Sequence, residues 1–286
     1  MSIQVARALV PVLLAAAPLP AQPVETLFAF GDSYTDSGAG YVDGNGPTAI
    51  VYVARDLGLP FTHAADPDAA GKGLNFAVSG AQTGEGKGSR VKDAWLGTGM
   101  QNQVRDFAAR VKAGDIRFDP SRTLFFIAGG LNDRSLETAT TAANLTAVVR
   151  QLHASGARRF LIAVLPTKIP AFAAVGIRLN PTLAALPAKL STAFPDSDIR
   201  SSRWGAYFDA ILEHPARYGI SNTTDPCAGR AIFDQDTTPR GAPETYFYYH
   251  EGHPSTATQR HVANELKREV LAFATPVTAE KKPSLP

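Results

Sequence analysis

The sequence predicts an α/β fold in which a parallel sheet is covered by helices on both faces. Three short segments, residues 26–30, 123–128 and 159–166, are apolar almost throughout, as strands buried on both faces are. Segments with a helical spacing of apolar side chains alternate with these strands, which is the order that βαβ units produce. Hydrophobic residues make up 44% of the chain and charged residues 19%, so the chain can bury a sizeable core and is not disordered.

In the first half of the chain, glycine-rich segments separate the predicted elements. The strand at 26–30 runs into a glycine-rich loop over 37–46. Residues 48–57 have apolar side chains at helical spacing and are followed by a glycine, so a helix is expected there. Residues 60–73 are rich in Pro, Asp, Ala and Gly, and residues 79–99 are rich in glycine, so both are expected to be loops.

In the second half, helices and strands alternate more regularly. An amphipathic helix over 101–112 precedes the strand at 123–128, and a helix over 138–154 precedes the strand at 159–166. A further helix is expected over 181–194, where Pro187 should break or kink it.

The last elements lead to the carboxyl end of the domain. Helices are expected over 205–212 and 256–273, the second with Ser255 as its N-cap. The aromatic run 246–249 either lines an acyl pocket or is a strand that packs its rings on the core.

The amino-terminal residues 1–21 read as a signal peptide. Arg7 is the only charged residue, an apolar run follows over 8–17, and residues 18–21 form a loose cleavage site. The alternative is a membrane-tethered or frayed terminus, but the run is too short to cross a bilayer. We therefore expect an exported protein with one domain over 22–275 and a flexible tail over 276–286.

Composition excludes several classes of protein. The formal net charge is +2 and no run of Lys and Arg occurs, so nothing indicates a nucleic-acid partner. After the amino-terminal run no stretch reaches about 18 consecutive apolar residues, so no integral membrane span is expected. The single cysteine, Cys227, excludes an intramolecular disulfide and a multi-cysteine metal site.

Three polar side chains lie where catalytic groups of α/β proteins are usually found. Ser33 follows the first predicted strand, Asn132 follows the second, and His253 precedes the last helix. Serine is a weak nucleophile that needs a base, histidine titrates near neutral pH, and an amide can donate to a developing oxyanion. Together these residues are the parts of an acyl-transfer site, although each alone is more often structural.

Four blocks of the sequence, in order, resemble those of the GDSL family of SGNH esterases and lipases. They occur between residues 30 and 254, over nearly all of the expected domain, and four ordered blocks make the resemblance specific. The blocks are Phe30-Gly31-Asp32-Ser33-Tyr34-Thr35-Asp36-Ser37-Gly38, Asn75-Phe76-Ala77-Val78-Ser79-Gly80-Ala81, Gly130-Leu131-Asn132-Asp133 and His253-Pro254.

The resemblance implies the fold and the chemistry. The fold would be a three-layer α/β/α sandwich with a mostly parallel, flavodoxin-like central sheet, the SGNH hydrolase fold. Ser33 would attack an ester and His253 would act as general base, without a metal or organic cofactor. The oxyanion hole would be formed by the backbone N–H groups of Ser33 and Gly80 and by the side chain of Asn132.

One position departs from the family pattern. The last block of the family usually reads Asp-X-X-His-Pro, and here His250 stands at the Asp position. The acid that would orient His253 is therefore missing from its usual place. Three replacements are possible: the carboxylate of Glu251, a backbone carbonyl, or His250 itself, which brings no negative charge. The first two are favoured equally.

Other reactive-looking side chains have plainer explanations. Cys227 has no histidine near it in sequence and is interpreted as a structural thiol. Asp32 and Asp36 are expected to fix the nucleophile loop by hydrogen bonds to backbone groups. The six histidines show no convincing metal-ligand spacing.

Three functions remain open at this stage. The leading one is an exported carboxylic-ester hydrolase acting on acyl esters or lipids. The second is a carbohydrate esterase that removes acetyl groups from glycans, since the resemblance covers both. The third is a catalytically silent binding protein on the same scaffold, suggested by the missing acid.

Overall fold

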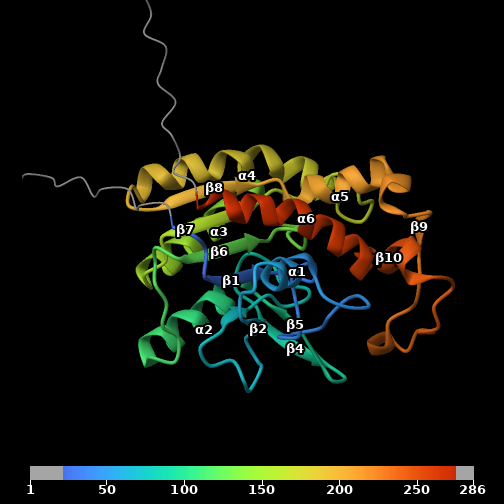
Figure 1. The fold of residues 1–286 in the computed structure, drawn as a ribbon, viewed down its shortest axis with the longest axis horizontal. Helices are drawn as coiled ribbons and strands as arrows, with labels where there is room; N and C mark the ends of the chain where they lie inside the picture. The colour runs from blue at the N-terminus through green and yellow to red at the C-terminus, as the bar shows by residue number, and fades with distance from the viewer. Residues whose placement is uncertain (1–21, 275–286) are drawn as a thin grey trace, which may run out of the picture.

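Six parallel strands form the central sheet of the computed structural model, which describes residues 22–274 (Figure 1). Their order is β2, β3, β1, β6, β7, β8, and all neighbouring pairs are parallel. The strands are β1 (Thr26–Gly31), β2 (Phe61–His63), β3 (Gly73–Asn75), β6 (Thr123–Ala128), β7 (Arg159–Ala163) and β8 (Asp198–Ser202). Apart from the edge strand β2, this is the flavodoxin-like order. The α/β prediction is confirmed, and the three apolar segments lie together at the centre of the sheet.

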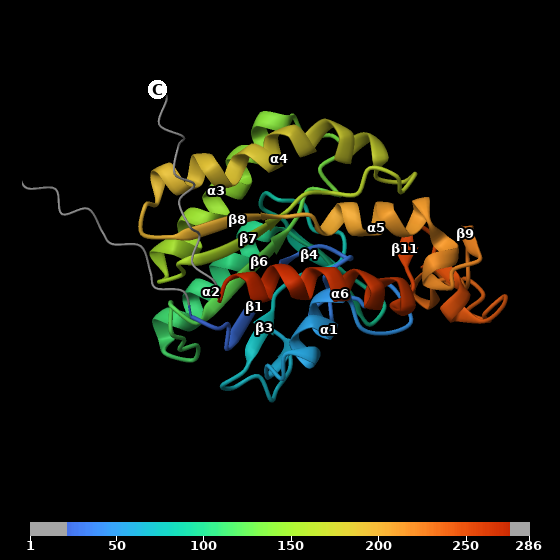
Figure 2. The same ribbon diagram turned by 45° about the horizontal axis from the view of Figure 1, so that its top comes forward.

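Helices cover both faces of this sheet, as Figures 1 and 2 show. On one face α1 and α6 pack together, with α5 beside α6, and on the other α2, α3 and α4 follow one another. This division follows from the right-handed connections between parallel strands. The helices are α1 (Ala49–Asp56), α2 (Met100–Ala113), α3 (Thr138–Ala154), α4 (Ala173–Ala193), α5 (Trp204–Glu213) and α6 (Thr256–Ala272).

Local sequence signals placed most helix ends correctly. All predicted helices except the one at 181–194 agree with the structure to within one residue at each end. The Ser255 hydroxyl accepts a hydrogen bond from the Thr258 N–H at 3.2 Å and caps α6 as predicted. Gly114 ends α2 in the left-handed conformation with φ 85°.

Phenylalanine rings fill the core between the centre of the sheet and α2. The ring of Phe107 in α2 packs edge-on against Phe28 of β1 and Phe125 of β6, with centroids 5.0 and 5.5 Å away. All three side chains are buried. Edge-on contacts of this kind add to the energy of burial, so they fix the strands whose carboxyl ends carry the polar residues.

Short strands occur where the sequence analysis expected loops. β2 and the start of β3 lie within residues 60–73, and the hairpin of β4 (Lys87–Val91) and β5 (Ala94–Thr98) lies within 79–99. At Gly73 the glycine allows close packing of two strands, because a Cβ there would lie 2.3 Å from the Leu27 carbonyl oxygen. At this position the glycine reflects tight contact between strands, whereas residues 64–72 and 79–86 are loops and turns, as expected.

Helix α4 is longer and more continuous than predicted. It contains both Pro181 and Pro187, and it begins at Ala173. The expected break at Pro187 is wrong. Pro187 is itself buried, and the buried Leu179 and Leu183 belong to the same helix. Burial of this apolar side against the rest of the molecule outweighs the backbone hydrogen bonds that the prolines remove.

A small second sheet lies at one end of the molecule (Figure 1). It consists of β9 (Asn222–Pro226), β10 (Tyr246–His250) and β11 (His253–Pro254). The strand interpretation of the aromatic run is confirmed, because Phe247 is fully buried in β10. The turn between β10 and β11 carries His253 toward the central sheet.

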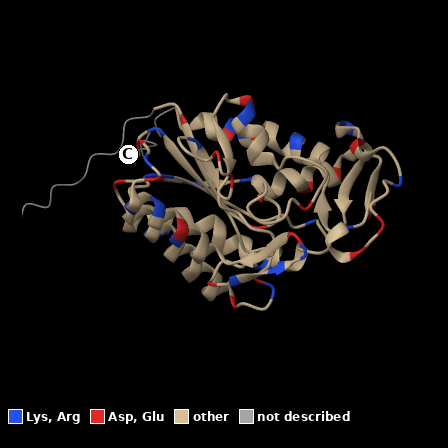
Figure 3. Cartoon of the chain, turned by 90° about the horizontal axis from the view of Figure 1, so that it is seen from below, with Lys and Arg blue, Asp and Glu red and all other residues tan. Residues whose placement is uncertain are grey.

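Two predictions concern residues that the structure does not describe. The signal peptide over 1–21 and the tail over 276–286 lie outside residues 22–274. Among the described residues, no helix combines the length and apolar character needed to cross a bilayer. In Figure 3, acidic and basic residues are interspersed over the elements in view.

Candidate active site

Ser33 lies in a tight turn directly after β1, at the carboxyl end of the central sheet. Two backbone N–H groups donate to the Asp32 carbonyl oxygen at 2.9 Å and close this turn. The strand enters the turn through Gly31, where a Cβ would lie 2.4 Å from the carbonyl oxygen of Ala128 in β6. Close packing of two central strands therefore determines where Ser33 lies.

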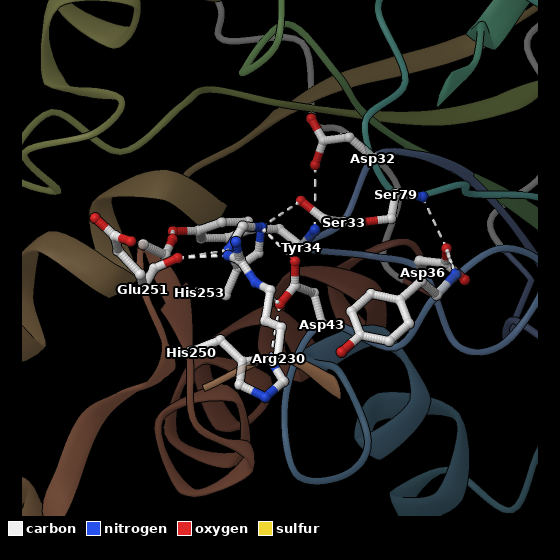
Figure 4. A network of polar contacts seen from close by, with 12 residues as sticks. Asp32, Ser33, Tyr34, Asp36, Asp43, Ser79, Arg230, His250, Glu251 and His253 are labelled. Carbon is white, nitrogen blue, oxygen red and sulfur yellow. Dashed lines mark hydrogen bonds and ion pairs between the residues drawn. The ribbon is translucent and has the colours of Figure 1, made fainter. Parts of the chain in front are cut away.

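The structure brings Ser33 and His253 into contact, although they are 220 residues apart in the chain. Ser33 Oγ and His253 Nε2 are 2.9 Å apart (Figure 4). The Tyr34 hydroxyl donates to the Gly252 carbonyl at 2.6 Å and ties the two turns together. The rings of Tyr34 and Phe172 lie against the imidazole, with centroids 5.6 and 6.3 Å from it.

Two groups compete for the other ring nitrogen of His253. The backbone carbonyl oxygen of Glu251 lies 3.0 Å from Nδ1, and Nη2 of Arg230 lies 2.5 Å from it. Arginine only donates, so Nδ1 either accepts from Arg230 or donates to the carbonyl. The second arrangement leaves Nε2 free to accept a proton from Ser33.

The contact between Glu251 and His253 is made by the backbone and not by the carboxylate. The Glu251 side chain is exposed, and within residues 22–274 it forms no hydrogen bond or ion pair with His253. His250 does not bond to His253 either; its Nδ1 lies 2.8 Å from Oδ1 of Asp43. Of the three replacements considered for the missing acid, the backbone carbonyl is the one in contact with the ring.

A carboxylate that the sequence analysis did not single out lies at the centre of this cluster. Asp43 contacts His250 through Oδ1, and the same oxygen accepts from Nε of Arg230 at 2.9 Å. Its Oδ2 lies 3.3 Å from Nε2 of His253. Spacing gives no signal for Asp43 or Arg230, because both lie in irregular loops far along the chain from His253.

The groups assigned to an oxyanion hole lie on three loops, and hydrogen bonds connect the two loops that carry Gly80 and Asn132. Asn132 donates through Nδ2 to the Ala81 carbonyl at 2.9 Å, and Gln82 donates to the Asn132 carbonyl at 3.1 Å. Gly80 is in the left-handed conformation, with φ 79°. In the described part of the chain, the backbone N–H groups of Ser33 and Gly80 donate to no protein acceptor. An oxyanion needs donors of this kind.

Buried carboxylates tie these loops together. Asp36 accepts hydrogen bonds from four backbone N–H groups, three in the loop over 38–41 and one on Ser79, at 2.8–3.2 Å. Asp133 accepts from Thr83 N–H at 3.0 Å and from the Thr141 hydroxyl at 2.8 Å. The predicted bonding of Asp36 to backbone groups is present.

Comparison with known proteins decides the family of this chain. The family model of the GDSL-like lipases and acylhydrolases matches residues 27–266. The chain belongs to this family. A thermolabile hemolysin from Vibrio parahaemolyticus is 24% identical over 249 residues, which are 78% of this chain and 54% of the relative. The chain thus spans about half the length of that curated relative.

Two solved structures of low sequence identity align with most of this chain. A lipolytic protein of the G-D-S-L family from Veillonella parvula aligns with a TM-score of 0.47 and 12% identity, covering 85% of this chain and 96% of the other. An acetylxylan esterase from Geobacillus stearothermophilus aligns with a TM-score of 0.45 and 16% identity, covering 87% and 95%.

In this GDSL family member, burial and nearby charges adjust the basicity of the histidine. Burial lowers the pKa of His253, and the Arg230 charge lowers it further, while Asp43 opposes both. Burial disfavours ionisation of Asp43, but the hydrogen bond from His250 and the charges of His253 and Arg230 outweigh it and lower the pKa of that carboxyl. On balance the pKa of His253 lies below its usual value, which favours the neutral imidazole.

The remaining candidates of this GDSL chain stay outside the cluster. Burial raises the pKa of Asp32 to about 7, and its Oδ1 accepts from the Tyr34 N–H at 3.2 Å. Cys227 is a buried free thiol whose Sγ lies 3.8 Å from the Gly241 carbonyl oxygen. Among residues 22–274, no group of three or more His, Cys, Asp or Glu side chains is arranged to hold a metal ion.

Proposed function

We propose that this protein is a serine-dependent carboxylic-ester hydrolase in which Ser33 is the nucleophile and His253 the general base. The observation that carries the proposal is the 2.9 Å contact between Ser33 Oγ and His253 Nε2 at the carboxyl end of the sheet. A serine and a histidine in hydrogen-bond contact are the minimum for nucleophilic acyl transfer. Membership of the GDSL-like lipase and acylhydrolase family supports the same chemistry.

The reaction would proceed through an acyl-enzyme. His253 Nε2 takes the hydroxyl proton as Ser33 Oγ attacks the ester carbonyl carbon. The carbonyl oxygen becomes an oxyanion that accepts hydrogen bonds from the N–H groups of Ser33 and Gly80 and from the Asn132 amide. His253 then protonates the leaving alcohol. Water attacks the acyl-enzyme and gives its proton to His253, which returns it to Ser33 Oγ as the acid leaves.

The Glu251 backbone carbonyl would select the working tautomer of His253. A base that accepts from Ser33 must carry its hydrogen on Nδ1, and that hydrogen would be donated to the carbonyl 3.0 Å away. The exposed Glu251 carboxylate has no part in this scheme.

Hydrolysis of p-nitrophenyl esters with acyl chains from C2 to C16 tests the proposal, with the Ser33→Ala variant as reference. An optimum at long chains would assign a lipase and an optimum at short chains an esterase. Release of acetate from acetylated xylan, without activity on long acyl chains, would assign a glycan esterase. If the parent protein hydrolysed none of these esters, the proposal would be overturned, and a catalytically silent binding protein would be the remaining function.

Replacing Asn132 by alanine is expected to lower kcat about 10²–10³-fold with little change in KM. An oxyanion-hole donor acts mainly in the transition state, so its loss affects the chemical step. Steady-state kinetics on the best p-nitrophenyl ester measures this split. Asn264→Ala, at an exposed position of α6, is the matched control and should leave kcat unchanged. A rise in KM at constant kcat would remove Asn132 from the oxyanion hole.

We further propose export, on the strength of the amino-terminal sequence alone. When the full chain is expressed in a bacterial host, the exported protein should begin near Gln22, as amino-terminal sequencing would determine. A Leu13→Asp, Leu14→Asp variant, which interrupts the apolar run, should remain uncleaved inside the cell. Uncleaved parent protein in the same fraction as this variant would contradict export.

A further inference from the structure

The acid of a serine hydrolase performs two tasks: it holds the histidine in the working tautomer and orientation, and it stabilises the imidazolium by its charge. In this protein the Nδ1 of His253 faces a neutral carbonyl, so the first task is covered without any negative charge. We propose that Asp43 performs the second task, and that His250, at the position usually held by the acid, holds Asp43 in place. This inference rests on the proposed function.

The position of Asp43 is suited to this task. Its carboxylate is 7% exposed, and Oδ2 lies 3.3 Å from Nε2 of His253, the nitrogen that receives the serine proton. Oδ1 is held by His250 Nδ1 at 2.8 Å and by Arg230 Nε at 2.9 Å. A carboxylate so deeply buried and so close to an imidazole lowers the free energy of its protonated form.

The loop that carries Asp43 is held against β10 of the small sheet and against the start of α6. The ring of Tyr41 stacks on His250 with an interplanar angle of 7°. At the other end of the loop, Asn45 accepts a hydrogen bond from the Thr256 N–H at 2.8 Å. Contacts on both sides of Asp43 thus hold its carboxylate next to the imidazole of His253.

Arg230 has the opposite electrostatic effect on His253 from that of Asp43. Its Nη2 lies 2.5 Å from His253 Nδ1, where a positive charge disfavours the imidazolium and a donor favours the wrong tautomer. The loop over 229–236 that carries Arg230 is anchored by Lys92, whose Nζ donates to the Ala231 carbonyl at 2.8 Å and pairs with Asp234. Removing Asp43 would leave Arg230 unopposed.

Besides the Ser33 hydroxyl and the Phe172 ring, five groups face His253 from the surrounding elements, and their charges determine the expected result. Three bring no fixed charge: the Glu251 carbonyl, the Tyr34 phenol, which donates to Gly252, and the His250 ring, which contacts Asp43. Asp43 and Arg230 bring opposite charges. Removal of Asp43 should therefore lower the titration midpoint of His253, and removal of Arg230 should raise it.

The test is the titration of His253 in the full protein, followed by NMR of histidine labelled with ¹⁵N and assigned with His253→Gln. Asp43→Asn should lower the midpoint by about 1 pH unit, and Arg230→Gln should raise it by a similar amount. The double variant should return close to the parent value. Asp119→Asn removes an exposed carboxylate before β6 and should cause no shift.

The same variants are then compared by the pH dependence of kcat/KM, whose acid limb reports the free base. Asp43→Asn should move this limb to lower pH and reduce the plateau about 10²-fold. The loss should be smaller than the roughly 10⁴-fold loss known for a triad whose acid also fixes the tautomer. Asp43→Glu, which keeps the charge, should recover part of the plateau.

The outcomes separate this inference from the proposed function. Equal midpoints in the parent and Asp43→Asn would overturn the inference even if Ser33→Ala abolishes hydrolysis. A shift caused by Glu251→Gln in place of Asp43→Asn would assign the acid to Glu251. Failure of the parent to hydrolyse any ester would overturn the function, while the NMR midpoints still decide whether Asp43 acts on His253. If Asp43→Asn does not fold, Arg230→Gln alone must still raise the midpoint.

Discussion

Replacement of Ser33 by alanine is expected to reduce ester hydrolysis about 10⁴–10⁶-fold. Without Oγ no acyl-enzyme can form, and the remaining rate would come only from binding and from the donors around the oxyanion. The change removes only one oxygen atom from a buried side chain, so the protein should fold as before. Hydrolysis of the preferred p-nitrophenyl ester by parent and variant measures the effect.

Two controls sharpen this comparison. Ser201→Ala removes a hydroxyl at an exposed position in the edge strand β8 and should retain full activity. Covalent labelling by a fluorophosphonate should add one group to the parent and none to Ser33→Ala, as intact-mass spectrometry would measure. Parent-like turnover by Ser33→Ala would remove this serine as nucleophile and with it the proposed mechanism.

Replacement of His253 by alanine is expected to reduce activity about as much as the loss of Ser33. Without a base the Ser33 hydroxyl keeps its proton, and the leaving alcohol receives none. Because the two side chains act as one unit, the double variant should lose no more than either single variant. Steady-state kinetics of the three variants at neutral pH measures this non-additivity.

An exposed histidine provides the matched control. His214→Ala, at the carboxyl end of α5, removes an imidazole outside the cluster and should leave kcat/KM unchanged. Losses for Ser33→Ala and His253→Ala that multiply in the double variant would show that the two side chains act independently. That result would contradict a shared proton transfer.

Local patterns predicted the elements that are buried or capped. The apolar segments at β1, β6 and β7 could only be strands covered on both faces, and Ser255 marked the start of α6. The same approach failed at β2, β3 and the β4–β5 hairpin, because these strands carry few large apolar side chains. At Gly73 the glycine reflects the approach of β1, a contact that no local window contains.

Motifs gave the parts of the candidate site that lie at strand ends. Ser33, Gly80, Asn132 and His253 were named from ordered blocks, and the structure places Ser33 and His253 in contact. Their catalytic roles stay predictions. The replacement for the usual acid was left open among three groups, and the sequence analysis did not consider Asp43 at all.

By itself the sequence determined the α/β class and the central strands, because these depend on periodicity. Ser33, Gly80, Asn132 and His253 were named from four blocks that resemble those of a known family. Only the tertiary structure decided that a carbonyl of Glu251 meets the ring of His253 and that Asp43 and Arg230 place opposite charges beside it. Electrostatic contacts depend on distance in space, and Asp43 lies 207 residues from His250, its partner. The loops that carry Asp43 and Arg230 meet at His253 because the folded core fixes the ends of both loops. No pattern along the chain predicts this contact.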